Sequence, residues 1–426
     1  MNIILNPGQM TAREYIDNKI NVFITGQGGT GKTELIKSIV INNKIGITSM
    51  TGISAILIGG RTLHSFLGIG LGLESAEIIY SKIKGNKFLV KKWNNLETLV
   101  VDEISMMSCE LLEKLELLAR LIRKNNLVFG GIHLVFSGDF CQLPSIGQNN
   151  NIDFCFNCET WSKCITKTVY LTEIIRQKNI DFQQLLSHIR LGVLSDEDKS
   201  ILLSRLGKDV SMHGIEPTFI QGLNVDVDKI NKNALKKLNL EKQKDGILLD
   251  FYEYEMSIEN DYNLPDYIVL KFIKNLIVSK KSKFCIGAQV MLLTNLDMDS
   301  SLCNGSRGII INFCDNIPVV KFYSGQIAQI NFHTWDYADG FHTIKATQIP
   351  LKLAYSISIH KMQGSTLDCA KINLKNIFEY GQAYVAISRV RTLEGLSITD
   401  IDFDNIQANP IAISYYHTLL NSHGNL

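Results

Sequence analysis

The sequence has few prolines, no long apolar run and almost no net charge. Only 7 of its 426 residues are proline, against 31 glycines, and 45% are hydrophobic, so a disordered, collagen-like or low-complexity chain is excluded. No stretch of about 18 uninterrupted apolar residues occurs, and Asn, Arg and Glu interrupt the N-terminal segment before a signal peptide could form. We therefore expect an intracellular, soluble protein of about two to four domains, without a membrane segment.

The small net charge limits how a polyanion could be bound. The 43 Lys and Arg nearly cancel the 42 Asp and Glu, which leaves +1, so a nucleic acid would need a local basic groove. Residues 82–92 carry five lysines and no acid, around Phe88 and before Trp93. Lysines beside an aromatic ring are typical of a groove for single strands, because they neutralise phosphates while the ring stacks on a base. A solvated charged face is the alternative interpretation.

The 9 cysteines are scattered along the chain, which indicates reduced thiols rather than a disulfide framework. Cys155 and Cys158 form a C-x-x-C motif, and Cys164 follows soon after. A structural zinc site would need a fourth ligand at finger-like spacing, and the sequence lacks one. Free, partly buried thiols are therefore the favoured interpretation, with zinc as the alternative.

The first half of the chain alternates apolar strand-like runs with helical patterns. Residues 109–124 repeat Leu and Ile at helical spacing, with Lys and Glu on the other face. This alternation predicts an α/β fold with parallel sheets covered by helices. Residues 285–350 instead carry short β-rich runs separated by turn signals, which predicts an all-β insertion. Strands of the first half are expected at residues 21–26, 44–50, 98–103 and 131–139.

Residues 26–33, GQGGTGKT, match the pattern G-x-x-x-x-G-K-[ST] between an apolar strand and a helical stretch. In such a loop the glycine N–H groups cradle phosphates, Lys32 reaches the β and γ oxygens, and the Thr33 hydroxyl binds Mg²⁺. With strand, loop and helix in register, a chance glycine-rich turn is disfavoured. The expected nucleotide-binding residues of the loop are Gly26, Gly28, Gly29, Thr30, Gly31, Lys32 and Thr33.

Two more strands end in polar residues. LVVDE places Asp102 and Glu103 at a strand end, where Asp102 can bind Mg²⁺ and Glu103 can polarise the attacking water. GIHLVFSGDFCQLP brings Asp139 and Gln142 to the end of another strand. Because the carboxyl ends of parallel strands face the ligand crevice, these residues together indicate a Mg²⁺-dependent nucleoside triphosphatase.

The order of motifs resembles the Pif (petite integration frequency) DNA helicases of superfamily 1B, relatives of the RecD group. The resemblance runs from Gln9 to about Leu396. TSMTGISAILIGGRTLHSFLGIGLG is similar to the single-strand-binding motif of that family, and LARLIRKNNLVFGGIHLVFSGDFCQLP is similar to its signature. LTEIIRQ, NGSRGIII, PLKLAYSISIHKMQGSTL and GQAYVAISRVRTLEGL then follow in family order.

The resemblance implies ATP as the nucleotide and assigns further roles. Gln9 would read adenine, Gly364 would belong to the nucleotide site and Gln142 would sense the γ-phosphate. Arg176 and Arg389 would reach the γ-phosphate from a second motor domain. Structural ion pairs and satisfied core histidines are the alternatives for the arginines and histidines. The implied catalytic set is Lys32, Glu103, Gln142, Arg176 and Arg389, and the DNA-binding set is Thr51, His64, Ser65, Lys87, Lys91 and His360.

The resemblance also implies two tandem RecA-like domains, with a small 1B element and an SH3-like all-β insertion called 2B. The chain would then be nearly all motor, without the long N-terminal extension of many eukaryotic relatives. The expected division is 1–68 and 98–167 for domain 1A, 69–97 for the 1B element, 168–284 and 350–426 for domain 2A, and 285–349 for the 2B insertion.

The expected function is that of an ATP-dependent DNA helicase with roles in DNA replication, repair and recombination. The resemblance alone supplies 5′ to 3′ polarity on single-stranded DNA and the substrates: forked duplexes, RNA–DNA hybrids or G-quadruplexes. The free protein is expected to be monomeric, and a nucleus or a viral replication site would suit it. One alternative is a DNA-stimulated ATPase or translocase that leaves duplexes intact. A non-catalytic DNA-binding module is disfavoured by the intact Lys32, Asp102 and Glu103.

Overall fold

The computed structural model divides the chain into two compact units, which are described separately. The first unit comprises Met1–Ser195, Phe378–Ser388 and Ile406–Leu426, and the second comprises Asp196–Ile377 and Arg389–Asn405. The described residues are 5–39, 42, 44–70, 72–144, 152–211, 215–222, 224–260, 265–276, 278–294, 296, 302, 305–338, 343–359, 362 and 365–422.

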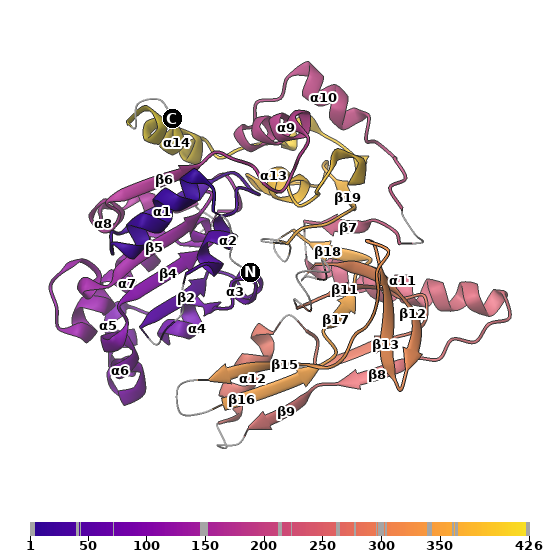
Figure 1. Ribbon diagram of the computed structural model, residues 1–426, viewed down its shortest axis with the longest axis horizontal. Helices are drawn as coiled ribbons and strands as arrows, with labels where there is room; N and C mark the ends of the chain where they lie inside the picture. Colours follow the sequence, from indigo (N-terminus) through magenta and orange to yellow (C-terminus); the bar gives the residue numbers. More distant parts are fainter. Residues whose placement is uncertain are drawn as a thin grey trace. The chain divides into compact units, whose positions relative to one another are not determined.

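A six-stranded sheet of order β3-β2-β4-β5-β1-β6 forms the centre of the first unit, and all its strands are parallel (Figure 1). The four strands expected from the sequence are confirmed as β1, β2, β4 and β5, and β6 is an edge strand beside β1. The bounds are β1 Val22–Gly26, β2 Ile45–Ser49, β3 Arg61–Thr62, β4 Thr98–Asp102, β5 His133–Gly138 and β6 Lys167–Leu171.

Successive residues of the central strands pack into two different cores, one on each face of this sheet. Val22 and Ile24 pack with the apolar residues of α1 and α2, whereas Phe23 packs with those of α5, α6, α7, α8 and α14. Because side chains alternate along a strand, both faces of the sheet are covered by helices. The bounds are α1 Pro7–Asp17, α2 Lys32–Lys37, α3 Gly52–Leu57, α4 Leu63–Leu67, α5 Ala76–Lys84, α6 Lys87–Asn95, α7 Cys109–Arg123, α8 Glu159–Cys164, α9 Ile180–Leu191, α13 Gln382–Ile387 and α14 Pro410–Ser422.

Helix α7 confirms the amphipathic helix expected at residues 109–124. Its N-cap is Ser108, whose hydroxyl accepts a hydrogen bond from the N–H of Leu111 and so satisfies one of the free donors of the first turn. Its buried residues recur at helical spacing and enter the core beneath β4 and β5. The short segment η1 (Ile104–Met106) joins β4 to this helix.

The second unit contains a four-stranded parallel sheet of order β18-β7-β19-β20. Its strands come from both sides of the predicted insertion, as expected for a domain that the insertion divides. The bounds are α10 Asp196–Leu203, β7 Thr218–Gln221, α11 Asn224–Lys244, β18 Ser356–Ser358, β19 Ala370–Asn373 and β20 Leu396–Asp400.

The predicted all-β region is a five-stranded antiparallel sheet of order β14-β13-β12-β11-β17. Alternate residues of these strands, such as Val290, Ile310 and Val320, form its core. Further antiparallel pairs join β10 to β8 and β15 to β16 to β9. The bounds are β8 Tyr252–Glu255, β9 Ser257–Asn260, α12 Asp266–Asn275, β10 Lys281–Phe284, β11 Gln289–Leu292, β12 Arg307–Cys314, β13 Ile317–Phe322, β14 Ile327–Gln329, β15 His333–Ala338, β16 Thr343–Gln348 and β17 Leu351–Leu353.

Two helix-covered parallel sheets with an antiparallel insertion confirm the expected fold class. The two compact units are divided at positions that differ from the expected domain boundaries. The boundary between residues 167 and 168 lies inside β6, which pairs with β1 in the first sheet, and the antiparallel strands begin at Tyr252 rather than at residue 285. The four-part division therefore stays a prediction. None of the helices in the described part of the chain combines the length and hydropathy needed to cross a bilayer.

Candidate nucleotide-binding site

The glycine-rich loop lies between β1 and α2, as its sequence predicts, and its backbone requires glycine. Gly26, Gly29 and Gly31 have φ values of 147°, 90° and 84°, in the region that L side chains rarely adopt. A Cβ at Gly29 would lie 2.7 Å from the Cβ of Arg176. The loop is therefore fixed in a shape that leaves main-chain N–H groups, rather than side chains, to bind phosphate.

Lys32 is the first residue of α2, and its side chain reaches back to the loop. Its ammonium donates hydrogen bonds to the carbonyls of Gly26 at 2.7 Å and Gln27 at 2.9 Å. Burial lowers the pKa of Lys32, although the carboxylates of Asp139, Glu103 and Asp102 act in the opposite direction. The lysine therefore lies among the polar residues that end β4 and β5, as the sequence predicts.

Asp102 and Glu103 lie at the carboxyl end of β4. Asp102 is 4% exposed, and its Oδ1 accepts a hydrogen bond from the hydroxyl of Ser137 on the neighbouring β5 at 2.8 Å. Burial raises the pKa of Asp102, and the Ser137 hydrogen bond only partly offsets this. Glu103 has φ 55° and ψ 44°, which turns the chain sharply out of the strand. Sequence reasoning missed Ser137, because its role comes from strand register.

Asp139, which follows the last residue of β5, forms a buried ion pair with Arg190 of α9. Their closest nitrogen and oxygen atoms lie 2.8 Å apart, and both side chains are almost fully buried. The Arg190 guanidinium also lies 4.6 Å from the ring centroid of Tyr416 on α14. The Tyr416 hydroxyl contacts the hydroxyl of Thr25 at 2.6 Å and accepts from the N–H of Phe140. Arg190 is therefore a buried structural residue that holds Asp139 in place, and not a surface charge.

Arg176 lies beside the glycine-rich loop and belongs to the same compact unit as Lys32. Its main-chain N–H donates to the carbonyl of Gly29 at 3.2 Å, and its Nη1 donates to the carbonyl of Ser388 at 3.0 Å. This differs from the expectation that Arg176 approaches from the second motor domain, because the contacts of residues 174–195 group them with the first sheet. Arg389 belongs to the second unit and is 2% exposed.

Helix α13 is held at two points, one on the loop and one on the segment that contains Arg176 and Gln177. The hydroxyl of Tyr384 accepts a hydrogen bond from the N–H of Gly28 at 2.7 Å. At the end of the helix, the carbonyl of Ser388 accepts from Arg176 and from Nε2 of Gln177 at 3.1 Å. Tyr384 and Gln177 were not singled out from the sequence, since no local motif marks contacts between segments more than 200 residues apart.

Gln9, the predicted adenine reader, is a buried capping residue of α1. Its Oε1 accepts from the N–H of Asn6 at 2.9 Å, and its Nε2 donates to the carbonyl of Gly31 at 3.0 Å. The glutamine therefore joins α1 to the end of the glycine-rich loop. Gln142 is 5% exposed and follows β5. The roles of Gln9 and Gln142 toward a nucleotide stay predictions.

The predicted DNA-binding residues of the first unit gather at one end of the sheet. Thr51 follows β2 and accepts a hydrogen bond from the N–H of Ser54, whereas His64 and Ser65 lie in α4, directly after β3. Since β2 and β3 are parallel neighbours, these residues share the carboxyl edge that also carries the loop. His360 and Gly364 lie outside the described residues.

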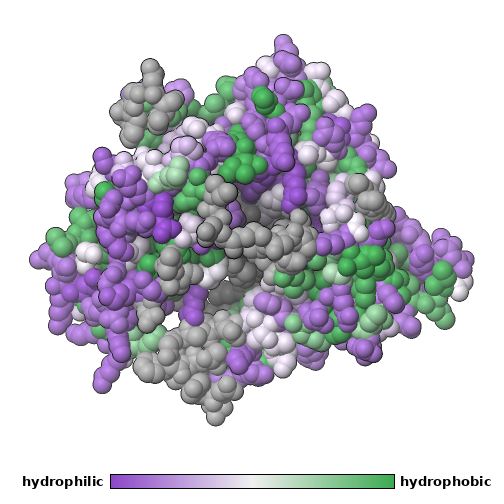
Figure 2. All heavy atoms as spheres, in the orientation of Figure 1, coloured by the Kyte–Doolittle hydropathy of each residue, from purple (hydrophilic) through white to green (hydrophobic). Residues whose placement is uncertain are grey.

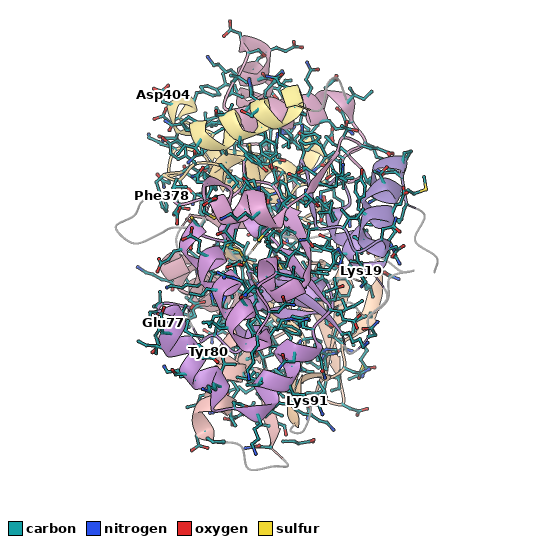
Figure 3. The ribbon with its side chains drawn as sticks, turned by 90° about the vertical axis from the view of Figure 1, so that its left-hand side faces the viewer. Lys19, Glu77, Tyr80, Lys91, Phe378 and Asp404 are labelled. Carbon is teal, nitrogen blue, oxygen red and sulfur yellow. The ribbon has the colours of Figure 1, made fainter. Side chains whose placement is uncertain are left out.

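The lysine-rich segment, residues 82–92, covers the end of α5 and most of α6, and both helices pack on α7. Lys87 and Lys91 are exposed on α6, and Figure 3 shows Lys91 there, with Glu77 and Tyr80 on α5. Side chains over these two helices are mainly hydrophilic on the face shown in Figure 2. Trp93 cannot stack on a base, because it is 1% exposed and its Nε1 donates to the carbonyl of Leu67. Lys82 is paired with Glu74.

Comparisons with known proteins show which family the chain is similar to. The PIF1-like helicase family matches residues 6–200, and the DNA helicase Pif1 2B domain matches residues 273–313. The Xenopus laevis ATP-dependent DNA helicase PIF1 is 40% identical over 409 residues, which cover 94% of this chain and 62% of the relative. The chain thus spans less than two thirds of the length of that relative.

Solved structures are similar over almost the whole chain. The Candida albicans Pif1 helicase is 32% identical with a TM-score of 0.79, over 98% of this chain and 100% of that one. A Bacteroides Pif1 helicase in complex with ADP-AlF3 and single-stranded DNA is 28% identical with a TM-score of 0.68, over 100% and 99% of the two chains. With the glycine-rich loop, the Asp102–Glu103 strand end and both parallel sheets in place, the chain belongs to the PIF1-like helicase family.

Proposed function

We propose that this chain hydrolyses Mg²⁺-ATP to move 5′ to 3′ along single-stranded DNA and to unwind DNA. The substrates would be forked duplexes, RNA–DNA hybrids or G-quadruplexes. The observation that carries the ATPase part is that Lys32, which follows β1 and the loop, and the pair Asp102 and Glu103, which ends β4, lie at the same edge of one parallel sheet. The Bacteroides Pif1 helicase, solved with a nucleotide analogue and single-stranded DNA, supports both ligands.

The residues present fit a Mg²⁺ ion. The Thr33 hydroxyl and the Asp102 carboxylate are the hard oxygen ligands that Mg²⁺ prefers. Burial raises the pKa of Asp102, and a cation beside it would hold that carboxylate ionised. When bound, Mg²⁺ neutralises charge that develops on the transferring phosphoryl group.

Each residue of the site then has a distinct task. The loop N–H groups and the Lys32 ammonium bind phosphate oxygens, so Lys32 would exchange its hydrogen bonds to Gly26 and Gln27 for bonds to the nucleotide. Glu103 accepts a proton from the attacking water, and Gln142 senses the γ-phosphate. Arg176 and Arg389 stabilise the transition-state charge, because a guanidinium fork matches phosphoryl oxygens.

The DNA track would follow the carboxyl edge of the sheet and then α6. Thr51, His64 and Ser65 supply polar contacts, and the exposed Lys87 and Lys91 neutralise phosphates. His360 is proposed for the same track from the resemblance alone. The proposed four-part division into domains 1A, 1B, 2A and 2B assigns α5 and α6 to the 1B element, and the free protein is proposed to be monomeric.

The experiment is a measurement of ATP hydrolysis with and without single-stranded DNA, beside DNA affinity at several salt concentrations. Hydrolysis should rise with DNA. Replacing Lys87 or Lys91 with Ala should reduce the log–log salt slope by about 0.7 for each phosphate that the lysine neutralises. Lys163→Ala, at an exposed lysine of α8, is the matched control. ATP hydrolysis that is unaffected by DNA, or a DNA affinity that is independent of salt, would contradict the proposal.

A translocase that does not separate strands is the second candidate, favoured by the same ATPase site. Strand separation distinguishes the two, since such a translocase hydrolyses ATP on single strands and leaves every duplex intact.

A further inference from the structure

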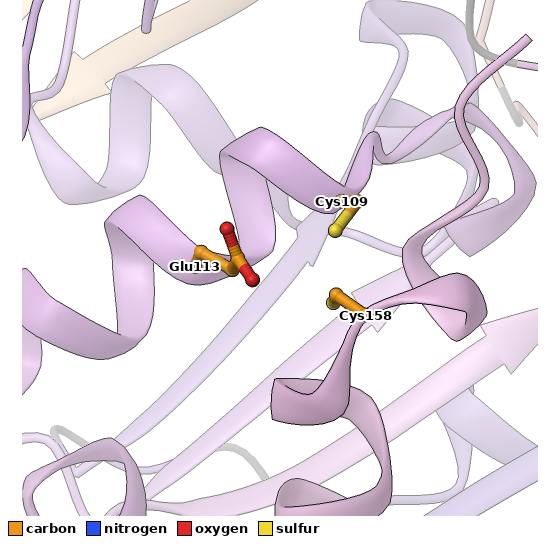
Figure 4. A group of neighbouring side chains, drawn as sticks. All are labelled: Cys109, Glu113 and Cys158. Atoms are coloured by element: carbon orange, nitrogen blue, oxygen red, sulfur yellow. The ribbon is translucent and has the colours of Figure 1, made fainter.

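A cluster of two thiols and a carboxylate lies in the first unit, apart from the glycine-rich loop. Cys109 is the first residue of α7, Glu113 follows it one helical turn later, and Cys158 is the N-cap of α8. Their ligand atoms all lie within 4.8 Å of one another. Figure 4 shows the three side chains directed into the space between α7 and the start of α8.

The cluster replaces the C-x-x-C arrangement that the sequence suggests. Cys155 is fully buried, and its Sγ contacts the carbonyl of Ile104 at 3.8 Å instead of joining the group. Cys158 meets Cys109, which is 49 residues earlier in the chain and comes from a different helix. Spacing within one segment could not reveal a pair of this kind.

The charges around the cluster leave a role for a cation. The other two acids of α7 have helical partners, since Glu110 pairs with Lys114 at 2.6 Å and Glu116 pairs with Arg120 at 2.8 Å. Within the described part of the chain, Glu113 has no ion-pair partner. Two thiols and a carboxylate that is not paired with a lysine or arginine of the described residues therefore face one another.

We propose that Cys109, Cys158 and Glu113 bind one zinc-type divalent cation, with a fourth position open to water. Thiolates and a carboxylate are ligands that Zn²⁺ prefers, at about 2.3 Å for sulfur and about 2.0–2.2 Å for oxygen. Two sulfurs in a tetrahedral site lie about 3.8 Å apart, so small side-chain rotations close the observed group onto an ion. Cys109 is partly exposed and Glu113 is exposed, which gives the ion a path from solvent.

The ion would restrain residues 104–108, the segment that follows the proposed catalytic residue Glu103. Residues 104–108 connect Glu103 to α7, and the N–H of Cys155 already donates to the carbonyl of Met107 at 3.2 Å. A bond from Cys109 through the ion to Cys158 would add a second link between the same two segments. Because the unfolded chain does not hold the ligands together, binding would stabilise the folded protein.

The experiment uses the whole chain, reduced with a non-chelating phosphine and freed of metal. Co²⁺ is added and thiolate-to-cobalt absorption is recorded, and then Zn²⁺ is added while competition and thermal unfolding are followed. One ion per chain should bind, with sulfur-to-metal absorption and a higher unfolding midpoint. Cys109→Ser and Cys158→Ser should each weaken binding at least tenfold, and Glu113→Gln should weaken it while keeping the sulfur absorption.

Cys314→Ser is the matched control, because Cys314 is an exposed thiol of the second unit. Circular dichroism of each metal-free variant shows whether it folds. If Cys158→Ser does not fold, because Cys158 is buried, the binding measured with Cys109→Ser decides, since Cys109 is partly exposed. Absence of stoichiometric binding, or binding unchanged in Cys109→Ser, would overturn the proposal. So would a Cys109–Cys158 disulfide, formed by peroxide with loss of two hydrogens, in a protein that binds no metal when reduced.

Discussion

The hydroxyl of Tyr384 accepts a hydrogen bond from the main-chain N–H of Gly28 at 2.7 Å. Gly28 belongs to the glycine-rich loop, and Tyr384 is a buried residue of α13. The same short helix ends at Ser388, whose carbonyl accepts from Arg176 and Gln177. The chain passes into the second unit directly after Ser388. The shape of the loop is therefore coupled to the point where the chain leaves the first unit.

Tyr384→Phe should destabilise the loop without creating a large cavity in the core, because the aromatic ring is kept. The substitution leaves the buried N–H of Gly28 without its acceptor, which costs about 1–3 kcal/mol. We expect a lower unfolding midpoint and a raised KM for ATP, measured by thermal unfolding and steady-state hydrolysis. Tyr80→Phe on α5 is the control. A Tyr384→Phe protein that matches the parent in both measurements would show that this hydrogen bond has no role.

Lys32→Ala and Glu103→Gln should separate nucleotide binding from hydrolysis. Lys32→Ala removes a phosphate contact, so hydrolysis should be lost while binding of single-stranded DNA largely survives. Glu103→Gln keeps the cation ligand Asp102 and removes the base, so nucleotide binding should persist while turnover falls. Nucleotide titration beside phosphate release measures both. Parental turnover in Lys32→Ala, or loss of nucleotide binding in Glu103→Gln, would contradict the assignment.

Replacing Arg190 with Met should destabilise the first unit strongly. The change leaves the Asp139 carboxylate buried without its partner, which costs about 3–5 kcal/mol. Arg391→Met is the matched control, because the Arg391 side chain is 49% exposed and its pair with Asp368 is worth at most about 1 kcal/mol. Urea unfolding of both variants measures the difference. Equal losses would contradict the view that Arg190 and Asp139 form a structural pair.

The same pair predicts how acid destabilises the protein. Burial opposes ionisation of Asp139, but the Arg190 guanidinium outweighs it and holds the pKa of Asp139 below its ordinary value of 3.8. A depressed pKa gives stability that is complete above pH 3.8 and is lost as pH falls toward the lower, folded-state value. Unfolding free energies measured across this range should fall less steeply in Arg190→Met. If the unfolding free energies of the parent protein and Arg190→Met fell in parallel with pH, protonation of Asp139 would not be linked to folding.

Arg176→Ala and Arg389→Ala should reduce DNA-stimulated hydrolysis by something on the order of a thousandfold, the scale of arginine fingers, with nucleotide affinity within a few-fold. Lysine should rescue poorly at either position, because a point charge cannot reproduce the planar fork. Arg176 also donates to Ser388, so a structural role would show as a lower unfolding midpoint with basal and stimulated rates reduced together. The two rates are measured beside a melting curve.

The sequence predicts the parts of the fold that depend on local periodicity. Leu and Ile at helical spacing indicated α7, and apolar runs indicated β1 and β5 within one or two residues. The glycine-rich loop was equally clear, since its motif is contiguous. Burial of the Trp93 indole could not be read from the neighbouring lysines, because it depends on packing between helices.

Pairings between distant residues could not be predicted from the sequence. Asp139 and Arg190 lie 51 residues apart, and nothing in either segment marks the partner. The turn between β12 and β13 is formed by Asp315 and Asn316, with φ of 49° and 61°, rather than by one of the Gly-containing pairs that signal such turns. These features follow from tertiary contacts, which override local signals.

A strand-displacement assay that compares 5′-tailed with 3′-tailed duplexes, with and without Mg²⁺-ATP, tests the proposed helicase activity itself. We expect ATP-dependent release of the labelled strand from the 5′-tailed duplex, little release from the 3′-tailed one, and none with Lys32→Ala. Efficient release from the 3′-tailed duplex would contradict the polarity. Hydrolysis stimulated by single strands without release from either duplex would contradict helicase activity itself.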